Sequence, residues 1–205
     1  SMGIQTFDDA TLRILNRRHT EQIARMATMR LREKGFQNIS IDLMYGLPGE
    51  TIEQRENDLQ QAIALNVEHI SAYHLTYEEG TPLYRRLQQG EVSEVSEELS
   101  LTFFNMLIDA LTKADYQHYE ISNFCKPGMH SRHNSSYWQG IPYLGCGAAA
   151  HSFDGTSRQW NVADIKTYIK GIETNEPCYE IEALDNATRY NEYIMTGLRT
   201  SHGIS

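Results

Sequence analysis

The sequence is poor in cysteine and contains no long apolar run. Its three cysteines, Cys125, Cys146 and Cys178, lie 21 and 32 positions apart. This odd, widely spaced set matches neither a disulfide framework nor a Cys-x-x-Cys metal site, so we expect reduced thiols. No apolar run approaches the roughly 20 residues that cross a bilayer, and no basic-then-apolar leader opens the chain. A cytoplasmic protein without a transmembrane segment is therefore expected.

Positive charge is also scarce. Lys and Arg number 18 against 27 Asp and Glu, which gives a formal charge of -9. This balance argues against a broad electrostatic grip on nucleic acid or anionic lipid. With 40% hydrophobic and 22% charged residues, the 205-residue chain has the composition of a globular protein with a sizeable core.

The first part of the chain repeats a strand followed by helix. Residues 3–7, 39–44 and 70–76 have strand-like patterns, and Gln5, Asp42 and Thr76 are separated by 37 and 34 positions. That spacing is close to the roughly 31 residues of one unit in a (β/α) barrel. The three polar residues lie near the carboxyl ends of their strands, where such sheets bind ligands. Each could equally be a solvated or hydrogen-bonded strand residue.

Cap signals and apolar periodicity predict the helices. Thr20 is a predicted N-cap, with Ile23, Ala27 and Leu31 on the buried face, and 51–54 reads as a capping box. The other predicted elements are helices at 8–19, 96–115 (with Phe104, Leu107, Ile108 and Leu111 facing the sheet), 164–173 and 187–200, and a further strand at 116–121.

A region rich in glycine and aromatic residues follows residue 121. Cys125, His130 and His133 lie close together in the sequence, but their spacing fits no structural zinc pattern, so we expect no metal site in this chain. His133-Asn134 and Tyr137-Trp138 place hydrogen-bonding groups beside aromatic rings, as in the lining of a ligand pocket. A solvated loop is the alternative interpretation.

Several segments resemble one known family. Residues 3–7, 41–51, 119–124, 131–138 and 143–147 are similar, in order, to the oxygen-independent coproporphyrinogen III oxidase family of radical S-adenosylmethionine (SAM) proteins. The Ser-Arg-His-Asn-x-x-Tyr-Trp segment at 131–138 resembles the haem-chaperone branch of that family in particular.

The resemblance implies an α/β fold: later units of a partial (β/α) barrel over 3–122, then a mixed α+β C-terminal region over 123–205. Ser1 and Met2 read as a remnant of cloning. The family's Cys-x3-Cys-x2-Cys motif, which holds a 4Fe-4S cluster, is absent from the chain. We therefore expect a piece of a longer radical SAM oxidoreductase that lacks the cluster-binding segment and is inactive alone.

The resemblance also implies which residues bind cofactors. It places Gln5, Arg17, Asp42 and Thr76 at positions that line the SAM site, and His151 at a further contact near that cofactor. Haem is a possible second ligand. The haem-binding candidates are His133, Asn134, Tyr137 and Trp138.

Two functions remain open within the family. The chaperone interpretation has the protein bind haem and deliver it to an acceptor protein. The oxidase interpretation has it convert coproporphyrinogen III to protoporphyrinogen IX by oxidative decarboxylation. Both involve a porphyrin or haem as partner and an electron donor for the cluster. A (β/α) fragment with no link to haem is the third, less specific interpretation.

Overall fold

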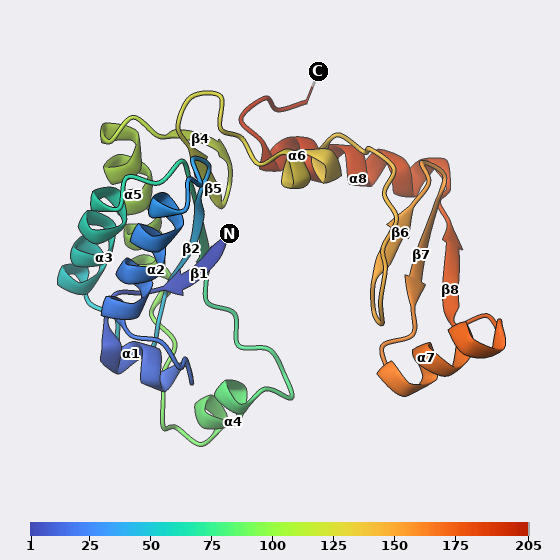
Figure 1. Ribbon diagram of the computed structural model, residues 1–205, viewed down its shortest axis with the longest axis horizontal. Helices are drawn as coiled ribbons and strands as arrows, with labels where there is room; N and C mark the ends of the chain where they lie inside the picture. The colour runs from blue at the N-terminus through green and yellow to red at the C-terminus, as the bar shows by residue number, and fades with distance from the viewer. Residues whose placement is uncertain (205) are drawn as a thin grey trace. The chain divides into compact units, whose positions relative to one another are not determined.

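The computed structural model describes residues 1–204. It divides the chain into two compact units, Ser1–His130 and Ser131–Ser205 (Figure 1). The boundary lies after His130 rather than after Ser122, because residues 123–125 form a strand of the first unit's sheet. Met2, assigned above to a cloning remnant, is the first residue of a strand.

The first unit contains a five-stranded sheet in the order β1-β2-β3-β5-β4. Strands β1, β2 and β3 are parallel neighbours, which confirms the expectation of successive βα units. The strands of this sheet are β1 Met2–Gln5, β2 Ser40–Tyr45, β3 His69–His74, β4 Gln117–Glu120 and β5 Asn123–Cys125. The helices of the unit are α1 Asp9–Ile14, α2 Glu21–Glu33, α3 Ile52–Ala64, α4 Pro82–Gln88 and α5 Glu97–Lys113.

The helices α2, α3 and α5 lie together on one side of this sheet (Figure 1). Strand β2 shows the consequence, since Ile41, Leu43 and Tyr45 are buried while the alternating residues are only partly buried. Phe103 and Leu107 of α5 belong to the same core, and both are 0% exposed. Successive strand side chains point to opposite faces. The second face of the sheet, which carries Asp42, is therefore the face that no helix of this unit covers.

Cap predictions were confirmed more closely than predictions of helix faces. Thr20 caps α2, and Thr51 with Gln54 forms the complete capping box of α3. The buried face of α2 was predicted only in part: Leu31 packs against the core, but Ile23 is 51% exposed, whereas Ala24 and Thr28 are buried.

Two further sequence predictions needed correction. Helix α1 ends at Ile14 instead of residue 19, because Asn16 has a left-handed φ of 55°. In α5 the fully buried aromatic residue is Phe103, while Phe104 is partly buried. A shift of the packed face of α5 by one residue explains this difference. The position of that face depends on how α5 packs against the sheet.

A short hairpin interrupts the parallel order. Strand β4 does not pair with β3, because β5 lies between them and is antiparallel to both. The turn is held by Ser122, whose N–H donates to Glu120 Oε2 at 3.0 Å, and the carbonyl of Ser122 accepts from Ala72 N at 2.7 Å. The strand predicted at 116–121 therefore exists, but it is one arm of a hairpin instead of the next barrel strand.

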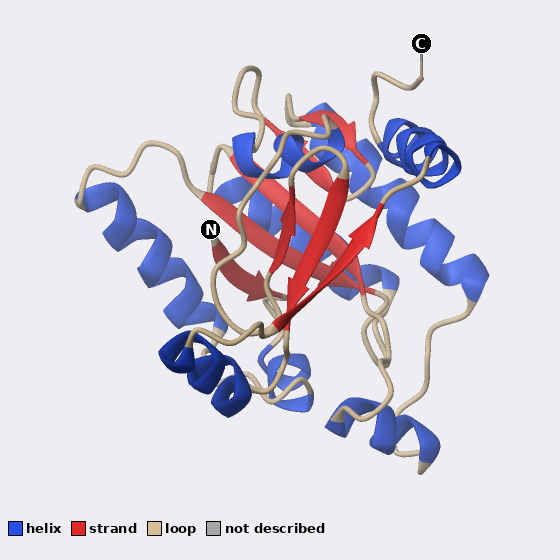
Figure 2. Cartoon of the chain, turned by 90° about the vertical axis from the view of Figure 1, so that its right-hand side faces the viewer, coloured by secondary structure: helices blue, strands red, loops and turns tan. Residues whose placement is uncertain are grey.

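The second unit contains a three-stranded antiparallel sheet in the order β6-β7-β8, whose strands are red in Figure 2. Arg158 of β7 forms a bidentate ion pair with Glu192 of α8, at 2.7 and 3.0 Å. The elements of this unit are α6 Arg132–Trp138, β6 His151–Phe153, β7 Ser157–Asn161, α7 Ile165–Thr174, β8 Tyr179–Ala183 and α8 Asn186–Arg199.

Among residues 1–204, no helix is long and apolar enough to span a membrane.

Candidate functional site

Gln5 and Asp42 face the same side of two neighbouring strands. Gln5 ends β1 with a φ of 72° and is 7% exposed. A side chain on Gly3 would have its Cβ 2.6 Å from Gln5 Nε2, so the Gln5 amide folds back over Gly3. Gly3 pairs with Asp42 in the parallel register. Because paired residues of adjacent strands point to the same face, the Gln5 amide and the Asp42 carboxylate share the helix-free face.

The height of Asp42 and Thr76 along the strands differs from the prediction. Asp42 lies in the middle of β2, level with Gly3 and Ser71. Its carboxylate accepts from Ser1 Oγ at 3.0 and 3.1 Å. Thr76 is exposed and lies two residues beyond the end of β3. The expectation that Asp42 and Thr76 end their strands at one level was wrong, because the parallel register places Asp42 well below the carboxyl edge.

Arg17 lies in the loop between α1 and α2 and is exposed. The loop is attached to β1 through a ring nitrogen of His19, which lies 3.0 Å from the carbonyl oxygen of Ile4. The structure therefore fixes this loop to the end of the strand that carries Gln5.

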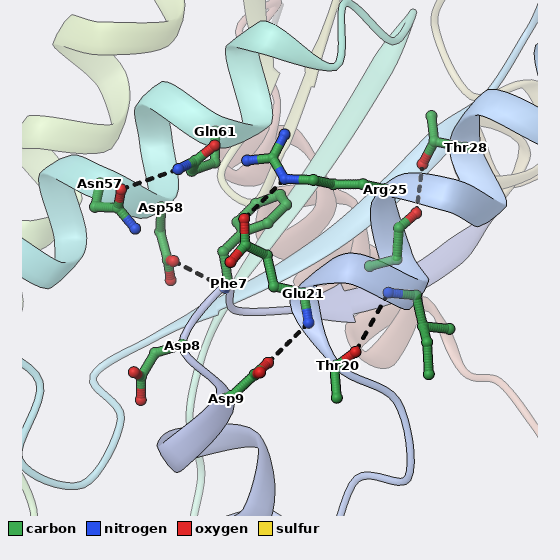
Figure 3. A network of polar contacts seen from close by, with 12 residues as sticks. Phe7, Asp8, Asp9, Thr20, Glu21, Arg25, Thr28, Asn57, Asp58 and Gln61 are labelled. Atoms are coloured by element: carbon green, nitrogen blue, oxygen red, sulfur yellow. Dashed lines mark hydrogen bonds and ion pairs between the residues drawn. The ribbon is translucent and has the colours of Figure 1, made fainter.

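Hydrogen bonds from α1, α2 and α3 fix the segment that follows β1 (Figure 3). Phe7 N donates to Asp58 Oδ1 at 2.8 Å, and Glu21 N donates to Asp9 Oδ1 at 2.8 Å. Arg25 lies over the Phe7 ring at 5.4 Å and pairs with Glu21. Three helices thus hold one loop at the carboxyl end of β1.

A buried charged group supports the next loop, at 46–50. Arg55 is 0% exposed, lies over the Tyr45 ring at 5.2 Å and donates to the carbonyl of Met44 at 3.4 Å. Glu50 Oε2 accepts from Leu47 N at 3.0 Å. Burial raises the pKa of Glu50 to about 7, and burial also lowers the pKa of Arg55. Glu50 Oε1 and Arg55 Nε and Nη2 are buried without a hydrogen-bond partner among the described residues.

Sequence reasoning missed a polar row across the helix-free face. Ser71 Oγ donates to Asn123 Oδ1 at 2.9 Å, and Asn123 Nδ2 donates to Glu120 Oε2 at 2.5 Å. Ser71 is also the partner of Asp42 in the β2–β3 register. The row therefore continues from the Gln5–Asp42 pair to the hairpin β4–β5. No local signal marks it, since it depends on the antiparallel placement of β5.

A second buried group lies at the first residue of β3. The ring nitrogens of His69 lie 2.8 Å from Ser40 Oγ and 2.7 Å from Tyr119 Oη. Burial lowers the pKa of His69 to about 4, so the ring is neutral at pH 7. It lies at the amino end of the parallel strands, the end associated with stability instead of ligand binding.

The haem candidates lie on the short helix α6. Ser131 is the N-cap, and Asn134 N donates to Ser131 Oγ at 3.2 Å. The rings of His133 and Tyr137 are edge to face with centroids 5.0 Å apart, and both side chains are exposed. Trp138 and Asn134 are partly buried. The structure thus brings His133 and Tyr137 together, one helical turn apart.

The remaining candidates lie elsewhere. His151 begins β6, and its ring is stacked near Trp160 with centroids 6.1 Å apart. His130 contacts the Tyr119 ring in the first unit. Cys125 is buried, and burial raises the pKa of its thiol to about 11. Within residues 1–204 no three histidine, cysteine or carboxylate side chains are grouped to hold a metal ion.

Comparison with known proteins gives the family. Residues 1–62 match the model of the radical SAM superfamily. The chain is 35% identical over 204 residues to "Heme chaperone HemW" of Lactococcus lactis subsp. lactis (strain IL1403), covering 100% of this chain and 54% of that protein. It is 36% identical over 206 residues to "Heme chaperone HemW" of Bacillus subtilis (strain 168), again covering 100% and 54%. These matches support a HemN/HemW-like radical SAM protein.

A solved structure agrees with the fold of this family. Coproporphyrinogen III oxidase (HemN) from Escherichia coli, a radical SAM enzyme, superimposes with a TM-score of 0.79 at 22% identity, covering 97% of this chain and 49% of that chain. The partial barrel with a mixed C-terminal region is thereby confirmed. The chain spans about half the length of the curated relatives it matches.

Radical SAM proteins use SAM and a 4Fe-4S cluster, and the residues present fit these two groups differently. The helix-free face offers an amide at Gln5 and a carboxylate at Asp42, above a glycine backbone that leaves room for them. These are suitable partners for the amino, carboxylate and hydroxyl groups of SAM. The cysteines do not fit a cluster, since two of the three are buried and the described residues contain no group of metal ligands.

Proposed function

We propose that the chain is part of a haem chaperone of the radical SAM type, which binds haem and delivers it to an acceptor protein in the cytoplasm. The observation that carries this proposal is the similarity at 35% and 36% identity, along the whole chain, to two proteins named haem chaperone. The likeness to HemN supports the fold alone. The chaperone is therefore favoured over coproporphyrinogen III oxidase activity.

The segment on α6 supports haem binding chemically. Haem iron takes an axial ligand with a free lone pair, and a neutral imidazole is one such ligand. His133 is exposed on α6 beside the Tyr137 ring, with Asn134 and Trp138 on the same helix. Aromatic rings offer flat apolar surface to a macrocycle. We assign His133 to the iron and Tyr137 and Trp138 to the porphyrin surface.

The first unit would hold SAM through Gln5 and Asp42 on the helix-free face, with Arg17 reaching from the α1–α2 loop and Thr76 contributing backbone groups. When it is bound together with a reduced cluster, SAM supplies one-electron chemistry to the protein, and the cluster needs an electron donor. The role of this chain's residues is to bind and orient: Asp42 accepts hydrogen bonds from hydroxyl or amino groups, and Arg17 pairs with a carboxylate.

A haem titration of the full-length protein tests the proposal. The parent should retain haem with a defined Soret band, and His133→Ala should weaken binding and shift that band. His202→Ala is a matched control, because His202 is exposed and lies beyond α8. Equal affinity and identical spectra for the parent and His133→Ala would remove His133 from the site.

The same preparation tests the oxidase. With reductant and SAM supplied, an oxidase converts coproporphyrinogen III to protoporphyrinogen IX, which chromatography resolves. We expect no turnover and stable haem retention. Turnover by a parent protein that releases haem freely would reverse the assignment.

A further inference from the structure

The first unit contains a concentration of arginine of which the assignments above use only Arg17. Residues 10–20 contain three arginines and residues 82–90 contain two, and neither segment contains an acidic residue. With histidine neutral, the two segments together carry a formal charge of +5, in a chain whose net charge is -9. We call this cluster the arginine patch, and its members are Arg13, Arg17, Arg18, Arg85 and Arg86.

The fold brings the two segments together. Arg86 Nη1 donates to the carbonyl oxygen of Ile14 at 3.1 Å, which joins α4 to the last residue of α1 across 72 positions of sequence. Figure 1 shows α1 and α4 at the same end of the first unit. Arg13 and Arg85 lie in the last turns of these two helices, and residues 17–18 lie in the loop that follows α1. The patch is therefore a product of the tertiary structure.

Most of the positive charge in the patch faces solvent. Within residues 1–204 its one ion pair joins Arg86 Nε to Glu91 Oε2 at 3.1 Å. The other four arginines are exposed. The partial negative charge at a helix C-terminus stabilises cations in the last turn, which accounts for Arg13 and Arg85. It does not account for the arginines at 17–18, because they lie beyond α1.

The acidic side chains around the patch make other contacts. Asp8 accepts from the N–H of the residue three positions on, at 2.7 Å, and Asp9 accepts from the first N–H of α2 at 2.8 Å (Figure 3). The glutamates at 78–79 precede the N-cap of α4, at the opposite end of this helix from Arg85. The patch thus presents cationic groups with little local compensation.

The patch lies at the ligand-binding end of the sheet. Helices α1 and α4 follow the carboxyl ends of β1 and β3, and α/β proteins bind ligands at the carboxyl ends of parallel strands. A ring nitrogen of His19, the residue after Arg18, lies 3.0 Å from the carbonyl oxygen of Ile4. Ile4 directly precedes Gln5. A partner on the patch is therefore held close to the strand that carries a proposed SAM contact.

From this placement we propose that the arginine patch is the docking surface for an acidic electron-donor protein. Radical SAM chemistry consumes electrons, so a donor must come close to the end of the sheet where SAM binds. Exposed guanidinium groups from two separate elements form a surface instead of a pocket, which suits a protein better than a small anion. The proposal depends on radical SAM chemistry and goes beyond haem delivery.

The charge of the rest of the chain makes this docking specific. With a net charge of -9, the protein repels an acidic partner over most of its surface. The patch is then the region where attraction wins, so it orients the partner during the encounter. The same net charge argues against nucleic acid or anionic lipid as the occupant, since both need a broad basic surface.

The test measures the binding of flavodoxin, an acidic flavin protein used as the probe, to the full-length protein by calorimetry. The double variant Arg18→Glu with Arg85→Glu should weaken binding about tenfold or more. The matched control is Lys166→Glu with Lys170→Glu, which makes the same charge change at exposed positions of α7 in the second unit and should bind like the parent. Arg17 and Arg86 are left unchanged because they have other contacts or assignments.

Ionic strength gives an independent readout. Raising it from about 0.01 M to 0.15 M shortens the screening length from about 30 Å to 8 Å, so the parent should lose affinity for flavodoxin while the double variant changes little. Circular dichroism verifies that each variant is folded.

Several outcomes would overturn the inference. It fails if the parent does not bind flavodoxin at low ionic strength, or if the Arg18 and Arg85 double variant binds it as well as the parent does. It also fails if that variant keeps its affinity for flavodoxin but loses haem or binding to anionic vesicles, since the patch would then serve a porphyrin or a membrane. If the parent retains no haem but binds flavodoxin through the patch, the proposed function fails and this inference stands.

Discussion

The two units of the chain use different means of stabilisation. Apart from Cys178 and Leu184, every buried hydrophobic residue in the described chain lies in the first unit. In the second unit, all five residues of β8 are exposed, and Leu198 of α8 is 68% exposed. The first unit thus has a core of its own, whereas the second relies on strand pairing and local polar contacts.

Aspartate caps illustrate those local contacts. Asp164 and Asp185 cap α7 and α8 and accept from the backbone N–H groups of Thr167 and Thr188, both at 2.7 to 2.8 Å. Hydrogen bonds to Asp164 from the Thr167 hydroxyl and N–H, and to Asp185 from the Thr188 N–H, hold the pKa of both carboxyl groups below the usual range. The difference between the units predicts that truncating apolar side chains will destabilise the first unit more than the second.

The largest expected effect is the loss of a core aromatic residue. Phe103→Ala should lower the free energy of unfolding by about 3–5 kcal/mol, because it removes a fully buried ring and leaves a cavity. The matched change Leu198→Ala in the second unit should cost no more than about 0.5 kcal/mol, since that side chain is exposed. Urea unfolding measures both. A similar loss for the two variants would show that the second unit has a core comparable to the first.

A pH-dependent effect is expected at His69, whose pKa is lowered to about 4 in the folded protein. The unfolded chain takes up the proton first as pH falls from about 6.5, so the stability of the parent falls between pH 6.5 and 4 by at most about 3 kcal/mol. His69→Gln removes this loss.

The difference in the free energy of unfolding between the parent and His69→Gln should therefore become smaller as the pH falls toward 4. Glu50, with a pKa raised to about 7, makes the free energy of unfolding change with pH in the opposite direction. Because Glu50 is present in both proteins, its contribution cancels when their free energies of unfolding are subtracted. Urea midpoints across this pH range test the prediction. Parallel profiles for the two proteins would contradict it.

A smaller effect distinguishes two glycines, one in each unit. Gly46 and Gly140 both have left-handed φ, at 72° and 62°, so alanine is strained at either position. At Gly46 the new Cβ would also meet the His74 ring at 2.5 Å, whereas nothing lies within 4 Å at Gly140. Gly46→Ala should therefore cost about 1–3 kcal/mol more than Gly140→Ala. Thermal unfolding of the two variants compares them directly, and equal losses would mean that His74 moves aside freely.

The smallest effect concerns the capping box of α3. Thr51→Ala removes the acceptor for Gln54 N, now at 3.2 Å, and should cost about 1 kcal/mol. Thr51→Ser keeps a hydroxyl and should cost much less. Urea midpoints test both variants, and the idea fails if serine and alanine are equally destabilising.

Local sequence determined the βα repeat, the capped starts of α2 and α3, and the family resemblance of the chain. These features depend on residues within one or two helical turns of one another, so their signals are contained in short windows. The motif around Gly46 and the segment at 131–138 carried the resemblance that the comparisons confirmed. The pairing of β1 with β2 in parallel was also expected from the spacing.

Only the tertiary structure decided which polar groups meet. The reversal of β5 places Asn123 beside Ser71, 52 positions away, and seats Tyr119 against His69, 50 positions away. Strand direction and register at such separations depend on which long-range pairing is most stable, and no local pattern records that choice. For the same reason the level of Asp42 within β2 was predicted wrongly.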